Sequence, residues 1–150
     1  MRFVRVASLV AASMLSVGLI AAPAQATPGS GVSGTIISDT TVGGTRYVLR
    51  EITVQPGGDT GWHYHTGPLY GVMEKGTLTR TFATVKQDCS ITETYSRGQT
   101  FVEPAGIDNE HTARNLGTKP AVLLVLYVLP AGTTDLSVDV SPAPCTPPTP

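Results

Sequence analysis

The sequence predicts an all-β fold, a sandwich or barrel of eight or nine short strands, and three observations support this. Apolar and β-branched residues alternate with polar ones at a period of two, as in residues 45–54, which is typical of a half-buried strand. Glycine and proline interrupt such segments at roughly even spacing, for example at 56–58 and 67–68. After the first 26 residues, no segment shows the 3.6-residue apolar period of a capped helix. Short strands joined by tight turns are typical of β-sandwiches and β-barrels.

The first 26 residues have the composition of a secretory signal peptide. Two arginines form a basic start, residues 6–22 are an apolar run, and Ala24-Gln25-Ala26 is a small-x-small cleavage site. We therefore expect cleavage after Ala26 and a secreted, extracellular protein. The alternative is an uncleaved membrane anchor, and the cleavage triplet and the polar segment that follows it argue against this.

The mature chain would have a thinly spread charge. Removing 26 of the 150 residues and two of the ten basic side chains leaves 124 residues with 8 basic and 11 acidic side chains, a net charge of −3. This length suits one domain with a single core. Because there is no basic patch and no phosphate-binding glycine loop, we expect neither nucleic acid nor an anionic membrane surface as a partner. We also expect no stable membrane insertion after cleavage.

Two cysteines, Cys89 and Cys145, would enter an oxidising compartment, where an even number favours a disulfide. The pair would close a loop of 56 residues and stabilise the fold by up to about 4 kcal/mol in the chain-entropy model. The alternative, a reactive or metal-binding thiol pair, lacks the close spacing that such sites usually have. We therefore expect a disulfide that tethers the proline-rich C-terminal tail.

The chain is expected to divide into four segments: the signal peptide at 1–26, a flexible Gly/Ser/Pro-rich lead-in at 27–34, the folded domain at 35–132 and the tail at 133–150.

Strand candidates follow one another through the folded domain. The first two are residues 35–39 and 45–54, joined by the turn signal Gly43-Gly44. In the second, Val48, Ile52 and Val54 share one face, and Tyr47 and Leu49 share the other. Further candidates are 62–65, 69–74, 77–82, 91–95, 100–103, 111–115 and 121–129. The last is a continuous apolar run, which predicts a strand that is buried on both faces.

The three histidines of the chain stand out as candidate ligands. His63 and His65 are two residues apart, so on a strand their imidazoles share one face and the flanking Trp62 and Tyr64 share the other. A strand can present two ligands to one ion in this way. His111 lies far along the chain, so a three-histidine site must be closed by folding.

Two segments resemble the conserved motifs of the cupin family. Residues 61–76, GWHYHTGPLYGVMEKG, resemble the first motif, and residues 98–115, GQTFVEPAGIDNEHTARN, resemble the second. The matching positions are His63, His65 and Gly76 in the first motif and Gly98, Pro104, Gly106, His111 and Asn115 in the second. The resemblance covers about 35–129 and implies a single jelly-roll cupin β-barrel of antiparallel strands. It further implies a small-molecule ligand in the barrel cavity and a homodimer through edge strands.

The sequence departs from the family pattern at one ligand position. The family's first-motif glutamate falls on Leu69, which cannot ligate a metal. The resemblance therefore implies three histidine ligands without the carboxylate. We interpret the nearby Glu74, Glu103 and Glu110 as solvated strand ends rather than as replacement ligands, and Tyr70 as a packing residue.

The predicted site of His63, His65 and His111 suits a divalent transition metal, either Zn, Fe, Mn, Ni or Cu, because imidazole binds such ions well. Three functions are then open. The first is a secreted metal-dependent enzyme, oxygenase-like, acting on a small molecule. The second is a non-catalytic module that binds a metal or small ligand. The third is a structural cupin whose site has decayed and is empty, as the loss of the carboxylate at Leu69 would indicate.

Overall fold

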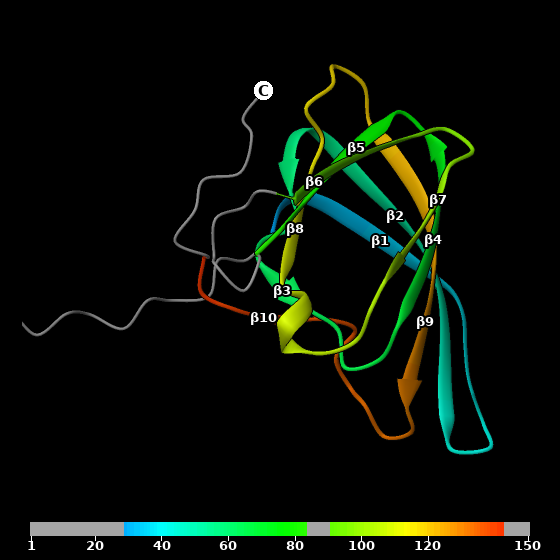
Figure 1. The fold of residues 1–150 in the computed structure, drawn as a ribbon. Coiled ribbons are helices and arrows are strands. Elements are labelled where there is room, and N and C mark those ends of the chain that lie inside the picture. Colours follow the sequence, from blue (N-terminus) through cyan, green and yellow to red (C-terminus); the bar gives the residue numbers. More distant parts are fainter. Residues whose placement is uncertain (1–28, 84–90, 143–150) are drawn as a thin grey trace, which may run out of the picture.

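The computed structural model describes residues 29–83 and 91–142, which form ten β-strands and one short 3₁₀ helix (Figure 1). The predicted signal peptide and both cysteines, Cys89 and Cys145, lie outside the described residues, so cleavage, secretion and the disulfide stay predictions. No helix in the described ranges is long and apolar enough to cross a membrane.

The elements follow the order of the sequence-based strand candidates. They are β1 (Ser30–Val42), β2 (Thr45–Asp59), β3 (His63–Tyr64), β4 (Leu69–Lys75), β5 (Thr77–Phe82), β6 (Ile91–Ser96), β7 (Thr100–Glu103), η1 (Ile107–Asn109), β8 (His111–Arg114), β9 (Ala121–Pro130) and β10 (Val138–Asp139).

The strands form two antiparallel layers that close into a barrel (Figure 1). One layer has the order β1-β2-β9-β4-β7, and the other has the order β6-β5-β8-β3-β10. The layers meet where the end of β2 pairs with β8, at Asp59 and Arg114. The prediction of an all-β jelly-roll barrel is confirmed.

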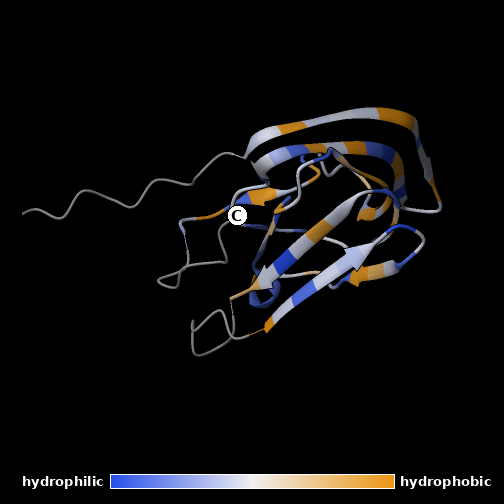
Figure 2. Ribbon diagram, turned by 90° about the horizontal axis from the view of Figure 1, so that it is seen from above, coloured by the Kyte–Doolittle hydropathy of each residue, from blue (hydrophilic) through white to orange (hydrophobic). Residues whose placement is uncertain are grey.

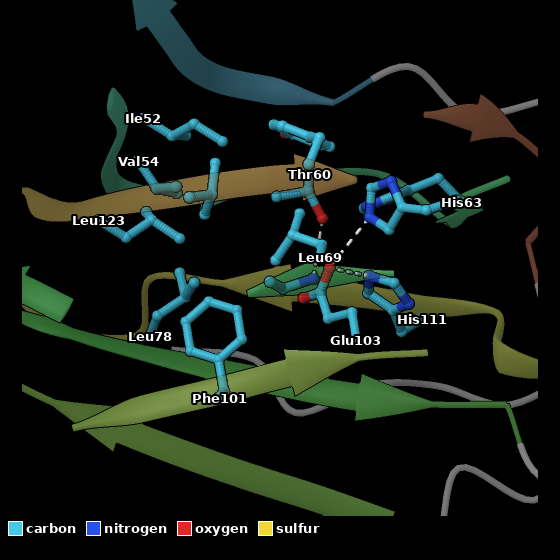
Figure 3. Close-up of a pocket in the computed structure, with 14 residues that line it drawn as sticks. Ile52, Val54, Thr60, His63, Leu69, Leu78, Phe101, Glu103, His111 and Leu123 are labelled. Atoms are coloured by element: carbon cyan, nitrogen blue, oxygen red, sulfur yellow. Dashed lines mark hydrogen bonds and ion pairs between the residues drawn. The ribbon is translucent and has the colours of Figure 1, made fainter. Parts of the chain in front are cut away.

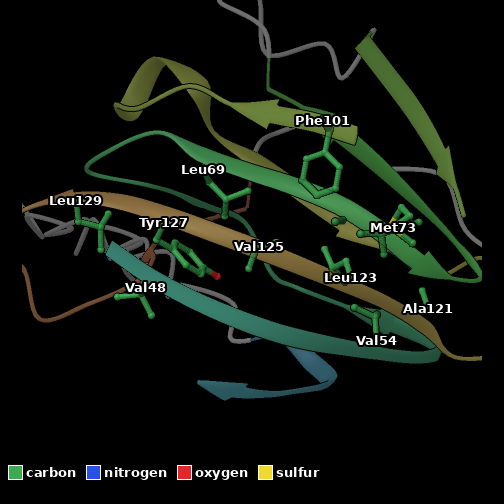
Figure 4. Packing of buried hydrophobic residues seen from close by; sticks show 12 residues of the cluster. Val48, Val54, Leu69, Met73, Phe101, Ala121, Leu123, Val125, Tyr127 and Leu129 are labelled. Carbon is green, nitrogen blue, oxygen red and sulfur yellow. The ribbon is translucent and has the colours of Figure 1, made fainter. Parts of the chain in front are cut away.

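The core lies between the two layers (Figure 4) and consists of the inward-facing residues of the strands. Hydrophobic and hydrophilic residues alternate along the strands (Figure 2). In β2 the predicted faces are confirmed, because Val48 and Val54 are fully buried while Tyr47 is 37% exposed. The alternation predicted from the sequence is therefore the alternation that builds the barrel.

The prediction that the last long strand is buried on both faces is wrong. In β9 the inward residues are buried, whereas the residues between them are half-buried. Among the described residues no further layer covers the outer face of β9, so neighbouring strands alone shield its outward side chains. The buried set is Ala121, Leu123, Val125, Tyr127 and Leu129.

The N-terminal part also differs from the expectation. Residues 30–34 were expected to belong to a flexible lead-in, but β1 begins at Ser30 and pairs with β2. Every residue of β1 is exposed, so backbone pairing with β2 and not side-chain burial orders this edge strand. Likewise β2 continues through Pro56-Gly57-Gly58, since Gly57 has a φ of 74° and a register shift in the pairing absorbs the irregularity.

The described part of the C-terminal tail is attached to the barrel. β10 pairs with β3, and the backbone N–H of Val140 donates to the carbonyl of Trp62 at 2.9 Å. Leu136 packs against the core. Backbone pairing therefore brings this segment to β3, which carries His63 and directly precedes His65.

Candidate metal centre

Folding brings the three predicted histidines together inside the barrel. His63 opens β3 and His111 opens β8, and the two residues are directly paired in the antiparallel register. His65 lies two residues after His63, on the same face, as predicted. The ring centroids are 5.0 Å apart for His63 and His65, 4.5 Å for His63 and His111, and 5.4 Å for His65 and His111. All three residues are buried.

A backbone carbonyl orients each imidazole ring. Nδ1 of His63 lies 2.9 Å from the carbonyl oxygen of Gly61, Nδ1 of His65 lies 2.7 Å from that of Leu136, and Nδ1 of His111 lies 2.8 Å from that of Asn109. A carbonyl oxygen accepts hydrogen bonds and cannot donate them, so each Nδ1 must carry the proton. In the neutral ring, Nε2 then has a free lone pair, which is the arrangement that metal-binding histidines adopt.

A carboxylate completes the group, and its source corrects our interpretation of Glu103 as a solvated strand end. Glu103 is 6% exposed, and its Oε2 lies 3.0 Å from Nε2 of His65 and 3.2 Å from Nε2 of His111. One ligand atom from each of His63, His65, Glu103 and His111 lies within 4.8 Å of the others.

The strand register explains why Glu103 takes this place. Leu69 on β4 is paired with Glu103 on β7, so the carboxylate arrives from the strand next to the position where the cupin pattern would place it. Phe101 and Glu103 both face the barrel interior, while Thr100 and Val102 are exposed. This alternation is a signal in the sequence that could have identified Glu103, because the apolar Phe101 marks the inward face.

The other candidate residues lie elsewhere. Glu74 is exposed and Glu110 is half-buried, and neither belongs to the convergent group. Tyr70, interpreted as a packing residue, is 49% exposed on β4 and does not line the cavity. Leu69 is buried and lines the cavity.

A buried arginine holds the other oxygen of Glu103. Nη1 of Arg80 donates to Oε1 of Glu103 at 3.1 Å, and Nη2 donates to Oε2 of Glu93 at 2.8 Å and to the Tyr95 hydroxyl at 2.8 Å. The guanidinium also lies over the ring of Phe82, 4.5 Å from its centroid. Oε1 of Glu103 is therefore occupied by Arg80, and Oε2 faces the histidines.

The electrostatics favour a neutral His63 beside an ionised carboxylate. Burial, together with the neighbouring His111 and His65, lowers the pKa of His63 to about 3. Burial opposes ionisation of Glu103, but the adjacent His111 and His65 outweigh it and hold the pKa of this carboxyl well below its usual range. At neutral pH the centre therefore combines neutral His63 with a negatively charged Glu103.

This donor set fits a metal ion. Nε2 of His111 is buried and lacks a hydrogen-bond partner, although Oε2 of Glu103 is 3.2 Å away. In the neutral tautomers with the proton on Nδ1, the Nε2 nitrogens and the carboxylate oxygen are all acceptors, and a metal ion or a proton on Nε2 would satisfy them. Three imidazole nitrogens and one carboxylate oxygen suit a divalent transition metal.

A small cavity adjoins the centre. It has a volume of about 50 Å³, with His63, Glu103 and His111 at one end and apolar side chains such as Ile52 and Leu123 at the other (Figure 3). The apolar wall comes from β2, β4, β5, β7, β8 and β9. The barrel interior is therefore filled by core side chains except next to the four candidate ligands.

Comparison with known proteins agrees with this architecture. A family model described as the cupin domain matches residues 50–127. No curated protein matches the chain. Among solved structures, a cupin domain from Bordetella pertussis is 27% identical, with 65% of this chain and 93% of that chain covered and a TM-score of 0.52.

Two similar structures below 25% identity support the fold alone. The polyketide cyclase RemF from Streptomyces resistomycificus is 21% identical, with 73% of this chain and 78% of that chain covered and a TM-score of 0.55. Oxalate oxidase in complex with the substrate analogue glycolate is 24% identical, with 65% of this chain and 50% of that chain covered and a TM-score of 0.53.

Proposed function

The chain belongs to the cupin family, and we propose that it is a metal-binding cupin in which His63, His65, Glu103 and His111 hold one divalent transition metal. One observation carries this proposal. Three imidazoles whose Nδ1 atoms are bonded to backbone carbonyls converge on one buried carboxylate, and one ligand atom of each of the four residues lies within 4.8 Å of the others. A divalent cation bound by the imidazole nitrogens and the carboxylate would satisfy this group of acceptors.

The metal would supply a Lewis acid with exchangeable positions, because four protein ligands leave room in the coordination sphere of most transition metals. A dication with one ionised carboxylate and three neutral imidazoles has a net charge of +1. The adjoining cavity would place a small organic ligand beside this charge.

Two functional candidates follow from this site. The described wall of the cavity contains no free carboxylate or imidazole besides the candidate ligands, so any reaction would depend on the metal and not on side-chain general acid–base catalysis. This favours a metal-dependent oxidoreductase or a non-catalytic binding module. Oxygen uptake by the metal-loaded protein with small organic acids separates the two, with Glu103→Gln as the site-deficient control.

The composition of residues 1–26 supports the further proposal that the protein is secreted. Protein purified from the culture medium with an intact mass starting at Thr27 would agree with it, and a retained N-terminus would contradict it.

The metal site is tested by the metal content of protein purified without an affinity tag and measured by mass spectrometry. We expect about one metal ion per chain in the native protein and a loss of this ion in a His63→Ala, His65→Ala double variant. Glu74→Gln is the matched control, because Glu74 is an exposed acid outside the group. A native protein that binds no metal after incubation with Zn²⁺, Mn²⁺, Fe²⁺, Ni²⁺ and Cu²⁺ in turn would overturn the proposal.

A further inference from the structure

The cavity beside the four candidate ligands has one polar end and an otherwise apolar wall. Apart from the ligands, Thr60 and Tyr127 are its polar residues. The Thr60 hydroxyl donates to the carbonyl of Gly61 at 3.2 Å and accepts from the N–H of Ala113 at 2.9 Å, so it is already satisfied. The wall therefore offers a ligand little besides hydrocarbon contact.

Tyr127 adds at most one hydrogen bond. Its pKa is raised by burial, so the hydroxyl is neutral, and the side chain of Arg50 hydrogen-bonds it. The Arg50 guanidinium is not part of the cavity wall and instead lies over the backbone of Gly34 on β1. Arg80 is likewise outside the wall and is bonded to Glu103, Glu93 and Tyr95. No cationic side chain therefore lines the described cavity to receive a second negative charge.

The size of the cavity limits the ligand further. Its volume is about 50 Å³, and a water-sized group needs roughly 10–15 Å³ on this measure, which leaves room for roughly three to five such groups. A sugar or an aromatic acid would not fit without displacing core side chains. A short aliphatic molecule would fit.

We infer that the site takes a small organic ligand with a single donor group, such as a carboxylate, facing the His/Glu group and a hydrocarbon part of a few carbons in the apolar end. The inference rests on the proposed metal function, because the net charge of +1 at the loaded centre is matched by one negative charge. A second carboxylate would be buried against apolar wall without a cationic partner, which is unfavourable. Short monocarboxylates are therefore preferred over dicarboxylates.

The test uses the full mature chain loaded with Co²⁺, whose visible spectrum reports ligand exchange, together with titration calorimetry of the Zn²⁺-loaded protein. The probes are formate, acetate, propionate, butyrate and hexanoate, with oxalate and malonate as the dianions. We expect affinity to rise about fourfold for each methylene added up to propionate or butyrate, and to fall at least tenfold at hexanoate. Oxalate and malonate should bind more weakly than acetate and propionate.

Substitutions in the cavity wall test whether the acid binds inside this cavity. Leu123→Ala enlarges the apolar end and should move the preference to a longer acid, whereas Ala113→Val narrows it and should move the preference to acetate or formate. Leu124→Ala is the matched control, because Leu124 follows Leu123 on β9 and faces outwards. Circular dichroism verifies the fold, and Ala113→Val, the milder change, decides the question if Leu123→Ala does not fold.

The outcomes separate this inference from the function on which it rests. A chain that binds neither Co²⁺ nor Zn²⁺ overturns both. A chain that binds the metal but shows no dependence on acid length, or prefers oxalate to acetate, overturns the ligand class and leaves the metal site standing. If affinity depended on acid length in the same way in the native protein and in both wall variants, the proposed ligand class would also be overturned.

Discussion

At the scale of single residues, the centre is defined by protonation as much as by position. Three carbonyls from separate segments, those of Gly61, Asn109 and Leu136, fix the tautomers of the three histidines. The fourth group, Glu103, has one oxygen occupied by Arg80 and the other directed to the imidazoles. The backbone thus orients the nitrogens, and a side-chain ion pair orients the carboxylate.

Replacing Glu103 with glutamine should remove the negative charge at nearly constant volume. Losing a residue that only orients a metal ligand typically weakens metal binding about 10- to 100-fold. We expect Glu103→Gln to weaken it by more than this, because Glu103 would itself be a ligand. Competition with a chromogenic chelator measures this affinity. Unchanged affinity in Glu103→Gln, with Glu74→Gln as reference, would show that the carboxylate is not a ligand.

Arg80 should act on the metal through Glu103. We expect Arg80→Met to weaken metal binding about 10- to 100-fold, because Oε1 of Glu103 loses its donor and the carboxylate becomes free to rotate. Glu93→Gln is the control, since it alters the outer partner of Arg80 and leaves the bond to Glu103 in place. The same chelator competition applies, and equal effects of the two variants would contradict a role for Arg80 in orienting Glu103.

The metal-free protein should lose stability as the pH falls from about 6.5 towards 3. His63 has a pKa of about 3 in the folded chain and 6.5 as its ordinary value, so between these values the unfolded chain binds more protons than the folded one. At pH 5 the loss relative to neutral pH should be about 2 kcal/mol, from 1.36 kcal/mol per pKa unit. The lowered pKa of Glu103 adds to the loss only below its ordinary value of 4.5, so the difference between pH 7 and pH 5 is assigned to His63.

Urea unfolding at pH 7 and pH 5 with a chelator present measures this effect. His63→Gln should remove most of the difference between the two pH values, because glutamine does not titrate. An equal difference in the native protein and in His63→Gln would assign the pH dependence to another group.

At the scale of elements, the register between β4 and β7 determines the composition of the site. Leu69 occupies the position of the family's first-motif glutamate, and the residue paired with it on the neighbouring strand, Glu103, supplies a carboxylate in the barrel interior. A carboxylate therefore lies beside the histidines although the first motif of the sequence lacks it. A motif search along one strand does not detect this carboxylate.

Interchanging Leu69 and Glu103 tests this interpretation of the register. Glu103→Leu should abolish metal binding, and the double variant Leu69→Glu, Glu103→Leu should regain part of it, because the carboxylate again faces the histidines from the paired position. Metal content and chelator competition are the measurements. A double variant no better than Glu103→Leu would show that the position of the carboxylate on β7, and its bond to Arg80, cannot be replaced.

The sequence could predict the strands and three of the four candidate ligands, because alternation and the His-x-His spacing are local patterns. Glu103 was missed since its role depends on which strand β7 pairs with, and register is a property of the folded sheet. The outer face of β9 was misjudged for a similar reason. A continuous apolar run does not say whether a second layer covers it.

At the scale of the whole molecule, the candidate ligands connect parts of the barrel that are distant in the chain. His63 and His65 belong to the β3 segment, Glu103 ends β7 and His111 begins β8. The carbonyl of Leu136, just before β10, orients His65, so the C-terminal segment also contributes to the centre. An ion at this point would join both layers of the barrel, since β7 belongs to one layer and β3 and β8 to the other.

Metal binding should therefore stabilise the fold as a whole and not only the region around the ligands. An ion that binds the folded chain alone, present at 100 times its dissociation constant, adds about 2.7 kcal/mol to the free energy of unfolding. For a domain of this size we expect Tm to rise by about 10 °C. Calorimetry of the metal-free protein with and without added Zn²⁺ measures the shift.

The Glu103→Gln variant should show a much smaller shift under the same conditions, whereas Glu74→Gln should respond like the native protein. A rise in Tm of equal size in Glu103→Gln would mean that the ion binds away from the barrel interior.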